Sequence, residues 1–496
     1  MKTTAIIRNT LAATLVAASL WSCAQQDSYL NAVPADTQCA IKINPGAIFA
    51  KTALTENTQF KSLMMTANGL LGMAIKDKDQ LEIVRAAMER PSAATGIDFS
   101  KPIVLTASNF GNVQNASDSA KVFIIVPLDN AEKLGNALAA AHAEVYPAEN
   151  GNTLGCYSNS GMSFAFGFND KALVINPIPF LKPSKETEND AILAGLLSQK
   201  NVTVANRFFD EFAKCSSDFA LWMDYGIYFD FLASVPNADD IAADAVMEAV
   251  ADRLDGAAVM ISTNAGQGNI TFRTDVFTNE TYPSGAESPE PLFKYLPSNS
   301  TFATAFKFNK DIMLEQYDTM FGDESREEYE KLVGTMGITT GQLFDLMAAG
   351  FACSVSQSES GKPEFTIVAA GLTDSLCNQF ASSLNISCDN IDVTTDGVYG
   401  IISSKGMAND GNFGSTRLAG MIKDGGLAVD FKTLDLSELE ESGSKGKNIA
   451  GQLLSILDYA KTYGENNGNS IIFEIAFDDK QANALETIAN FVLNIK

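Results

Sequence analysis

Short stretches of alternating apolar and polar residues recur along the chain, which is the pattern of strands that bury one face. The clearest two are Ala40–Asn44 (AIKIN) and Ala305–Asn309 (AFKFN), which match in residue type at every position and lie 265 residues apart. In both halves of the chain, apolar stretches with helical spacing follow this strand, and further strands follow the helices. The two halves are therefore predicted to share one order of elements, with Lys42 in the place of Lys307.

Further matches between the halves support an internal duplication. Three more pairs of similar segments occur in the same order: Val122–Val126 with Phe365–Ala369, Gly155–Tyr157 with Gly397–Tyr399, and Asp170–Val174 with Asp424–Ala428. Four collinear matches predict two related modules that differ by insertions. The segment between them, residues 279–291, contains three prolines and a Ser-Gly-Ala-Glu-Ser centre, which is typical of a linker.

The fold class follows from these elements. Strands joined by short Gly/Asn turns pair antiparallel, and the helices must cover one face of each sheet. We predict an α+β protein made of two related modules, each an antiparallel sheet covered by helices on one face. The predicted helices include Asn130–Val145, Ser375–Leu384 and Asn448–Tyr463. The predicted organisation is a signal peptide at residues 1–22, a lipid tether at 23–28, module 1 at 29–278, the linker at 279–291 and module 2 at 292–496.

The composition is consistent with this fold and argues against nucleic acid as a partner. The chain has 496 residues, of which 46% are hydrophobic and 19% charged, and this composition is typical of a globular protein. One hydrophobic core seldom serves a chain of this length, so two domains are expected. The formal net charge is −25. Because binding to a polyanion requires clustered Lys and Arg, nucleic acid is not expected as a partner.

The first 23 residues have the features of a secretory signal. Lys2 and Arg8 precede an apolar run, Leu11–Leu20, that is too short for a permanent membrane span. The run ends in Leu20-Trp21-Ser22-Cys23, which resembles the lipobox of bacterial lipoproteins. The resemblance implies cleavage before Cys23 and acylation of Cys23 with chains such as palmitate, which together give stable anchoring. An ordinary signal peptide with a chance cysteine is the alternative.

The other six cysteines are too few for a disulfide framework in a chain of this length. Only Cys377 and Cys388 are close in sequence, and they lie at opposite ends of the helix predicted at Ser375–Leu384. A helix of this length holds its two ends far apart, so a disulfide between them would require the chain to fold back. We expect free, buried cysteines and leave the state of this pair open.

Catalytic motifs are scarce. The single histidine, His142, is spaced by four residues from Leu138 on the helix predicted at Asn130–Val145, so a packing role is expected. The chain lacks an HExxH helix, a GxSxG elbow and a P-loop. No catalytic residue, metal site or cofactor is therefore assigned. Whether the chain is an enzyme stays open, and a non-catalytic role is favoured.

One loop and many acids leave open questions. Lys445, Gly446 and Lys447 precede the helix predicted at Asn448–Tyr463, where two cations and free N–H groups could bind an anion. A solvated loop is the simpler interpretation. A glycosidase uses two carboxylates at a set distance from each other. A chain with 60 Asp and Glu residues contains many pairs of acids, and the sequence does not give the distance between their carboxyl groups.

A family resemblance adds a location. The lipobox, Leu30–Asp36 (LNAVPAD) and the strand Ala40–Asn44 together resemble uncharacterised lipoproteins of Bacteroidota that carry a domain of unknown function. The resemblance covers most of residues 29–496. It implies an outer-membrane lipoprotein and supplies no catalytic residues. Three tripeptides also resemble the O-glycosylation sequon of that phylum, which makes candidates of Ser119, Thr319 and Ser375.

Two functions remain from the sequence. The first is a non-catalytic envelope lipoprotein, held to the membrane through the lipid on Cys23, whose modules present a cleft to an unknown protein or small ligand. The second is a carboxylate-based hydrolase of envelope glycan, which requires two acids facing each other across a deep pocket. The side of the outer membrane, the partner and the oligomeric state stay open.

Overall fold

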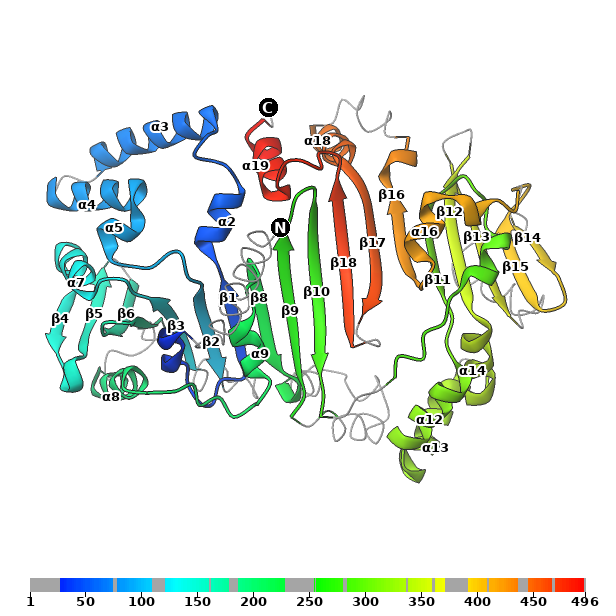
Figure 1. The fold of residues 1–496 in the computed structure, drawn as a ribbon, viewed down its shortest axis with the longest axis horizontal. Coiled ribbons are helices and arrows are strands. Elements are labelled where there is room, and N and C mark those ends of the chain that lie inside the picture. Colours follow the sequence, from blue (N-terminus) through cyan, green and yellow to red (C-terminus); the bar gives the residue numbers. More distant parts are fainter. Residues whose placement is uncertain are drawn as a thin grey trace, which may run out of the picture. The chain divides into compact units, whose positions relative to one another are not determined.

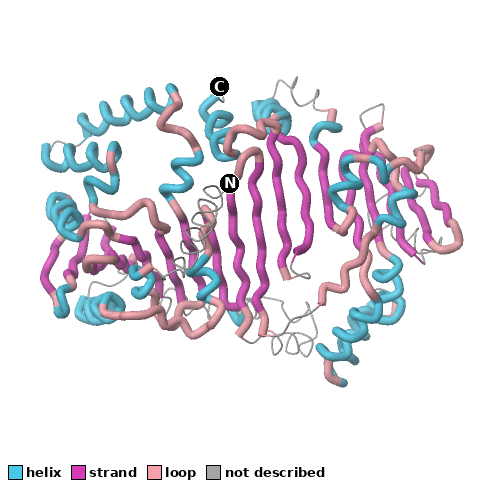
Figure 2. Tube along the Cα trace, in the orientation of Figure 1, coloured by secondary structure: helices cyan, strands magenta, loops and turns pink. Residues whose placement is uncertain are grey.

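The computed structural model describes residues 27–74, 78–108, 121–159, 162–177, 186–227, 254, 256–279, 283–335, 338–358, 362–370, 391–407, 410–435, 445–465 and 469–494. The chain divides into two compact units. Unit 1 comprises Met1–Ala47 and Ser62–Met223, and unit 2 comprises Ile48–Lys61 and Asp224–Lys496. Both contain helices and antiparallel strands, so the predicted α+β class is confirmed (Figures 1 and 2).

Unit 1 contains a sheet with the strand order β8-β1-β2-β3-β7-β6-β5-β4. The strands are β1 Cys39–Ile43, β2 Ile103–Ser108, β3 Lys121–Pro127, β4 Glu144–Pro147, β5 Thr153–Asn159, β6 Met162–Phe168, β7 Ala172–Asn176 and β8 Phe219–Asp224. The helices of this part of the chain are η1 Ser28–Ala32, α2 Pro45–Lys51, α3 Thr58–Ala74, α4 Lys78–Glu89, α5 Pro91–Thr95, α7 Ala131–Ala140, η2 Glu149–Gly151, α8 Glu186–Leu197 and α9 Phe209–Lys214. Leu134 of α7 packs with Phe166 and Phe168 of β6 in its core.

Unit 2 contains a sheet with the strand order β9-β10-β18-β17-β16-β11-β12-β13-β15-β14. The strands are β9 Ala258–Ala265, β10 Asn269–Phe277, β11 Ser300–Phe306, β12 Phe351–Gln357, β13 Pro363–Ala370, β14 Ile391–Thr395, β15 Tyr399–Ser404, β16 Gly426–Asp430, β17 Leu457–Glu465 and β18 Ser470–Phe477. The helices are η6 Glu290–Tyr295, α12 Lys310–Met320, α13 Asp323–Thr335, α14 Thr340–Ala349, η8 Phe413–Ser415, α16 Arg417–Ile422, η9 Phe431–Thr433, α18 Lys445–Ser455 and α19 Ala484–Asn494.

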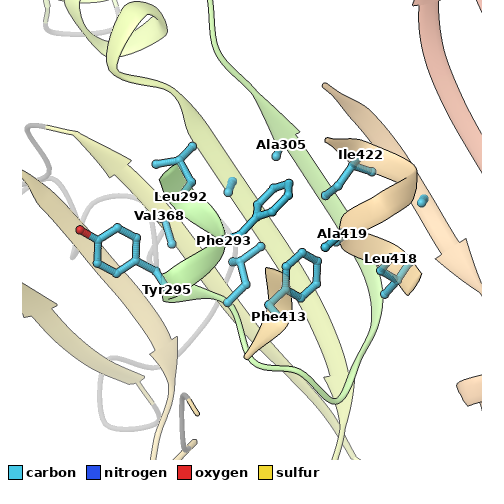
Figure 3. Close-up of a cluster of buried hydrophobic side chains, with 13 residues drawn as sticks. Leu292, Phe293, Tyr295, Ala305, Val368, Phe413, Leu418, Ala419 and Ile422 are labelled. Atoms are coloured by element: carbon cyan, nitrogen blue, oxygen red, sulfur yellow. The ribbon is translucent and has the colours of Figure 1, made fainter. Parts of the chain in front are cut away.

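One face of the unit 2 sheet carries the main core of that unit. Small residues of the central strands, Ala303 and Ala305 of β11 among them, allow η6, η8 and α16 to pack closely on this face. Phe293 of η6 and Phe413 of η8 meet edge to face with ring centroids 5.3 Å apart (Figure 3). The opposite face of the same sheet is covered at one corner by α19, whose Ala484 packs in a cluster with strand residues.

The compact units do not coincide with the modules that the repeat predicts. β9 and β10 belong to module 1 by sequence, yet β10 pairs with β18 along its length, from Asn269 opposite Ala476 to Asp275 opposite Ser470. This pairing places both strands in unit 2. The compact units therefore divide between Met223 and Asp224, before the linker predicted at residues 279–291.

The two halves nevertheless share a local plan. β1 lies between β2 and β8, and β11 lies between β12 and β16. A short helix precedes each of these central strands, and a hydroxyl then closes the same turn onto a proline carbonyl. The Thr37 hydroxyl donates to Pro34 O at 2.7 Å, and the Ser300 hydroxyl donates to Pro297 O at 2.7 Å. This agreement supports the duplication, which stays a prediction until the two copies are superposed.

The two lysines that the sequence aligns lie at different places in their strands. Lys42 lies inside β1, between Val104 and Ala220 of the neighbouring strands, whereas Lys307 follows the end of β11. The shared turn places Thr37 with Ser300, an offset of 263 residues, against 265 for the predicted match of the lysines. The match between Lys42 and Lys307 stays a prediction until the two copies are superposed.

Two predicted helices end earlier than expected, and one lies outside the described residues. The predicted helix Asn448–Tyr463 is α18 followed by β17, which pairs with both β16 and β18. The predicted helix Asn130–Val145 is α7 followed by β4. In both places, pairing with a neighbouring strand outweighs the helical spacing of the apolar residues. The helix Ser375–Leu384 lies outside the described residues.

Candidate binding site

Each unit has a pocket where its central strand ends and the strand beside it begins. In unit 1 the pocket, of about 330 Å³, lies at the end of β1 and the approach to β8. In unit 2 the pocket, of about 430 Å³, lies at the end of β11 and the start of β16. The two pockets thus occupy corresponding places in the shared plan.

A buried lysine closes the pocket of unit 1. Lys42 is 1% exposed and donates to three carbonyls at the end of α9: Phe212 O, Ala213 O at 2.9 Å and Cys215 O at 3.1 Å. Its ammonium also lies 4.7 Å from the centroid of the Phe212 ring. The carbonyl end of a helix favours a cation, so Lys42 caps α9. All three of its N–H donors are used, and Lys42 therefore supports the wall of the pocket.

Burial changes the titration of the groups in this pocket. Burial lowers the pKa of Lys42 to about 8. The Tyr29 hydroxyl donates to Pro102 O at 2.8 Å, and burial together with the charges of Asp27 and Asp98 raises the pKa of Tyr29. Both groups are held in fixed hydrogen bonds, which indicates a structural role for each.

The pocket of unit 2 combines charge with exposed apolar side chains. Lys307 pairs with Glu287 at 2.7 Å, and the Asn309 side chain donates to the other oxygen of Glu287 at 3.0 Å. These two hydrogen bonds hold the pKa of the Glu287 carboxyl below its usual value. Phe306 and Ile471 also line the pocket and are 40% and 59% exposed. Such a mixture suits recognition of a ligand that is partly apolar.

Two glycines set the floor of this pocket. Gly425 has a φ of +89° and Gly426 a φ of +133°, which are conformations that other residues rarely adopt. A Cβ added at Gly426 would lie 2.1 Å from Thr462 O. The glycines therefore let β16 begin tightly against β17, and the neighbouring strands β11 and β17 continue past that point to form the walls.

A charged network fixes the strands next to the pocket. The Arg273 guanidinium donates to Asp275 at 2.9 Å, to Glu465 at 2.8 Å and to the Ser470 hydroxyl at 2.8 Å. These partners belong to β10, β17 and β18. Because Asp275 and Ser470 are buried, satisfying them by hydrogen bonds avoids a large desolvation cost. The network keeps the three strand ends in register.

An apolar strip extends from the pocket along one face of the unit 2 sheet. Residues directly opposite each other in a sheet share a face, so the pairs Phe306 with Phe351 and Phe272 with Phe473 each lie on one side. Following the pairings across the sheet places four exposed side chains on this side: Phe272, Phe306, Phe351 and Ile471, which are 36% to 59% exposed. We call them the open strip. An exposed apolar patch of this kind is typical of an interaction surface.

Most of the modification sites expected from sequence lie where the structure gives no description. Cys23, Ser119 and Ser375 lie outside the described residues. Thr319 is exposed in the last turn of α12, and its hydroxyl donates to Glu315 O at 2.6 Å.

The candidate anion site takes a different form from the expected loop. Lys445, Gly446 and Lys447 form the first turn of α18, which begins three residues before the predicted start at Asn448. Gly446 is exposed, with nothing within 4 Å of an added Cβ. A helix start without a bound ion or a second feature supports no ligand, so the anion site stays a prediction.

His142 does not pack as expected. It follows the end of α7 in a turn, with a φ of +60° and an exposed side chain, and is not on the helix stripe. The thiols of Cys39, Cys215 and Cys353 are free and partly buried, and burial raises the pKa of Cys39 and Cys353. Cys377 and Cys388 lie outside the described residues.

Two searches of the described residues for other sites found nothing. No group of three or more His, Cys, Asp or Glu side chains in this part of the chain is placed to hold a metal ion. No helix among the described segments is both long and apolar enough to cross a membrane.

Comparison with known proteins identifies a family. A family model described as "Domain of unknown function (DUF4836)" matches residues 29–303, more than half of the chain. The chain belongs to this family. The match runs from η1 through unit 1 and into β11 of unit 2, which confirms the expected membership of an uncharacterised family. The family description assigns no activity, so the function has to be inferred from the residues of the candidate site.

Other comparisons add little. No curated protein matches the chain. A solved structure titled "Structure of crystal form III of TP0453" is 8% identical and covers 76% of this chain and 92% of its own, with a TM-score of 0.22. A likeness at that TM-score carries no argument.

The open strip is the feature that the sequence analysis missed. A signal for it is present in Ile471-Ile472-Phe473, where apolar residues occupy both faces of β18. A strand that is apolar on both faces is normally covered on both. The sequence does not show that one of the covers is incomplete.

Proposed function

We propose that this protein is a lipid-anchored component of the outer membrane that acts as a non-catalytic binding module. The observation that carries the proposal is the open strip beside the pocket of unit 2, where Phe306 and Ile471 are exposed. Exposing large apolar side chains costs free energy unless they are covered in the working state. A partner that covers them explains why they are tolerated.

The anchor is proposed to be Cys23, as the lipobox implies. The described chain begins at Asp27, which lines the pocket of unit 1. Asp27 is the fourth residue after Cys23, and an extended chain spans at most about 14 Å over those four steps. This arrangement would hold the pocket of unit 1 close to the membrane surface, on whichever side of the outer membrane the lipid lies.

The glycan hydrolase stays the alternative function. A glycosidase needs one carboxyl group with a raised pKa to act as general acid. Hydrogen bonds instead lower the pKa of three carboxyl groups: Glu287 through Lys307, Asp396 through Tyr295, and Asp410 through Ser298. None of these three groups is therefore a candidate for the general acid.

Two measurements test the proposed function. Membrane extracts of the wild type and of Cys23→Ser are compared by detergent phase partition, and the wild type alone should enter the detergent phase. Partners crosslinked in the envelope are then compared for Ile471→Asp and for Val398→Asp, a 62% exposed apolar residue of unit 2 outside the strip. Loss of one partner with Ile471→Asp alone supports the binding role, whereas equal recovery by both variants contradicts it.

A further inference from the structure

The outer face of the helix α3 is apolar and exposed. Leu63, Leu70 and Met73 are spaced by seven and three residues, which places them on one side of the helix. Their exposed fractions are 57%, 57% and 72%. Met65 lies beside them and is 76% exposed. Met65 and Met73 are the two most exposed large apolar side chains of the described residues. We call these four side chains the α3 face.

The opposite side of α3 is turned toward its own unit. Met64 and Leu71 on that side are half-buried. The helix α4 lies beside it, because Arg85 of α4 donates to Asn68 O at 3.5 Å. In Figure 1, α3 runs along the outer edge of unit 1 with α4 on its inner side. A helix that is apolar on all sides is normally buried on all sides, so the α3 face needs a cover.

The charge of α3 indicates what kind of surface covers it. Its 17 residues contain no acid and one charged residue, Lys61, although the chain as a whole contains 60 acids. The neighbouring α4 contains three acids in 12 residues. Anionic phospholipids repel acidic side chains and attract lysine. The charge of α3 therefore fits a phospholipid surface.

The side chains of the α3 face also favour a bilayer over a protein. The side chains that contribute most to protein interfaces are Trp, Tyr and Arg, and the α3 face has none of them. Leucine and methionine are flexible and apolar, and acyl chains can surround them without a fixed geometry. With 17 residues, α3 is about 25 Å long and falls short of the length of a membrane-spanning helix. It would therefore lie along the bilayer surface.

The anchor proposed at Cys23 enters unit 1 at the strand end from which the chain leaves for α3. Asp27, the first described residue, lines the pocket at the end of β1, and Asn44, the residue after β1, lines the same pocket. From Asn44 the chain continues through α2 to α3. The tether and α3 thus start from one end of β1, where a single bilayer can receive both.

We propose that α3 is an interfacial membrane helix that lies in the plane of the phospholipid bilayer holding Cys23, with Leu63, Leu70 and Met73 among the acyl chains. This inference rests on the proposed anchor and adds a second contact with the same bilayer. Lys61, near the start of the helix, extends its ammonium to the phosphate groups. Helices of this kind bind membranes through apolar area and charge without spanning them. Two contacts fix the orientation of unit 1 on the membrane, which a tether alone does not.

Quenching of tryptophan fluorescence by brominated lipid tests the inference. The proposed mature chain lacks Trp21 and keeps only Trp222, which is 0% exposed. Mature Met73→Trp is purified from membranes and placed in vesicles of phosphatidylcholine and phosphatidylglycerol, with or without bromine on the acyl chains. We expect bromine to remove the fluorescence that Met73→Trp adds and to leave that of Trp222 unchanged. Val398→Trp, at a 62% exposed residue of unit 2, is the matched control and should not be quenched.

A second variant tests whether the α3 face makes the contact. Leu70→Asp is added to the Met73→Trp chain. It should lower the share of α3 in the bilayer about tenfold or more, because burying a leucine is worth at least that factor in an equilibrium constant. Quenching by bromine should then fall to the level of Val398→Trp.

Three results would overturn the inference. One is Met73→Trp fluorescence that bromine does not quench, and another is quenching that Leu70→Asp leaves unchanged. The third is a shift of the Met73→Trp emission to shorter wavelength without quenching, because a protein, such as a second copy of the chain, would then cover α3. The mass of the N-terminal peptide reports on the anchor separately. Quenching in a chain without acyl groups would contradict the anchor alone.

Discussion

Phe272 and Phe473 face each other across the β10 and β18 pair, with their ring centroids 5.9 Å apart. β10 lies in the predicted first module and β18 in the predicted second, so one sheet combines strands from both halves of the chain. Without β10, β18 would present an unpaired edge, and such edges promote aggregation. The second half of the chain is therefore incomplete without β9 and β10.

The same relationship predicts a difference between two equivalent isoleucines. Ile270→Ala should lower the free energy of unfolding by about 2–4 kcal/mol because it leaves a cavity under α19. Ile471→Ala should cost less than about 1 kcal/mol because the side chain is already largely in water. Urea unfolding of both variants under the same conditions checks this, and equal losses would show that Ile471 is covered in the free protein.

Gly426 is predicted to be essential to the pocket of unit 2. Gly426→Ala places a Cβ at 2.1 Å from Thr462 O at a φ of +133°, so the start of β16 must move and stability should fall by about 2 kcal/mol or more. Gly420→Ala, in α16 with nothing within 4 Å of the added Cβ, is the control and should be neutral or slightly stabilising. Thermal unfolding distinguishes the two, and a neutral Gly426→Ala would refute this account of the pocket floor.

The lowered pKa of Lys42 should make the free energy of unfolding depend on pH. Burial lowers its pKa from 10.5 to about 8 in the folded chain. Above about pH 8 the unfolded chain binds the proton more than the folded chain does, so the unfolding free energy rises with pH until about 10.5. Lys42→Met removes this contribution.

The measurement is urea unfolding of the wild type and Lys42→Met at about pH 7.5 and about pH 9.5. The wild type should gain up to about 2 kcal/mol relative to the variant over this interval. A difference that does not change with pH would show that Lys42 keeps an ordinary pKa, and a change in the opposite direction would show that folding raises its pKa.

Strands were predicted where alternation is strict and local. Ala40–Asn44, whose residues alternate, is predicted as a strand and lies within β1 except for Asn44. The segment Asn448–Tyr463 was predicted as one helix because its apolar residues recur at helical spacing. Tyr459, Lys461 and Tyr463 also alternate, and only the neighbouring strands β16 and β18 decide between the two patterns. Long-range pairing of this kind leaves no local signal.

The site was harder to predict for a related reason. The pocket of unit 2 depends on where β16 starts, and the open strip depends on which end of a sheet face a helix covers. The AIKIN and AFKFN matches suggest that Lys42 and Lys307 are equivalent, but Lys42 lies inside β1 whereas Lys307 follows the end of β11. Residue types repeat in short motifs, whereas register is fixed by the whole strand.

The most direct test of the proposed function is the mass of the mature protein extracted from membranes, with sequencing of its N-terminal peptide. A lipid-anchored protein predicts a chain that begins at Cys23, lacks residues 1–22 and has the added mass of acyl chains on that residue. A chain that retains residues 1–22, or that begins at another residue without acylation, would contradict the anchor and with it the proposed place of this protein in the envelope.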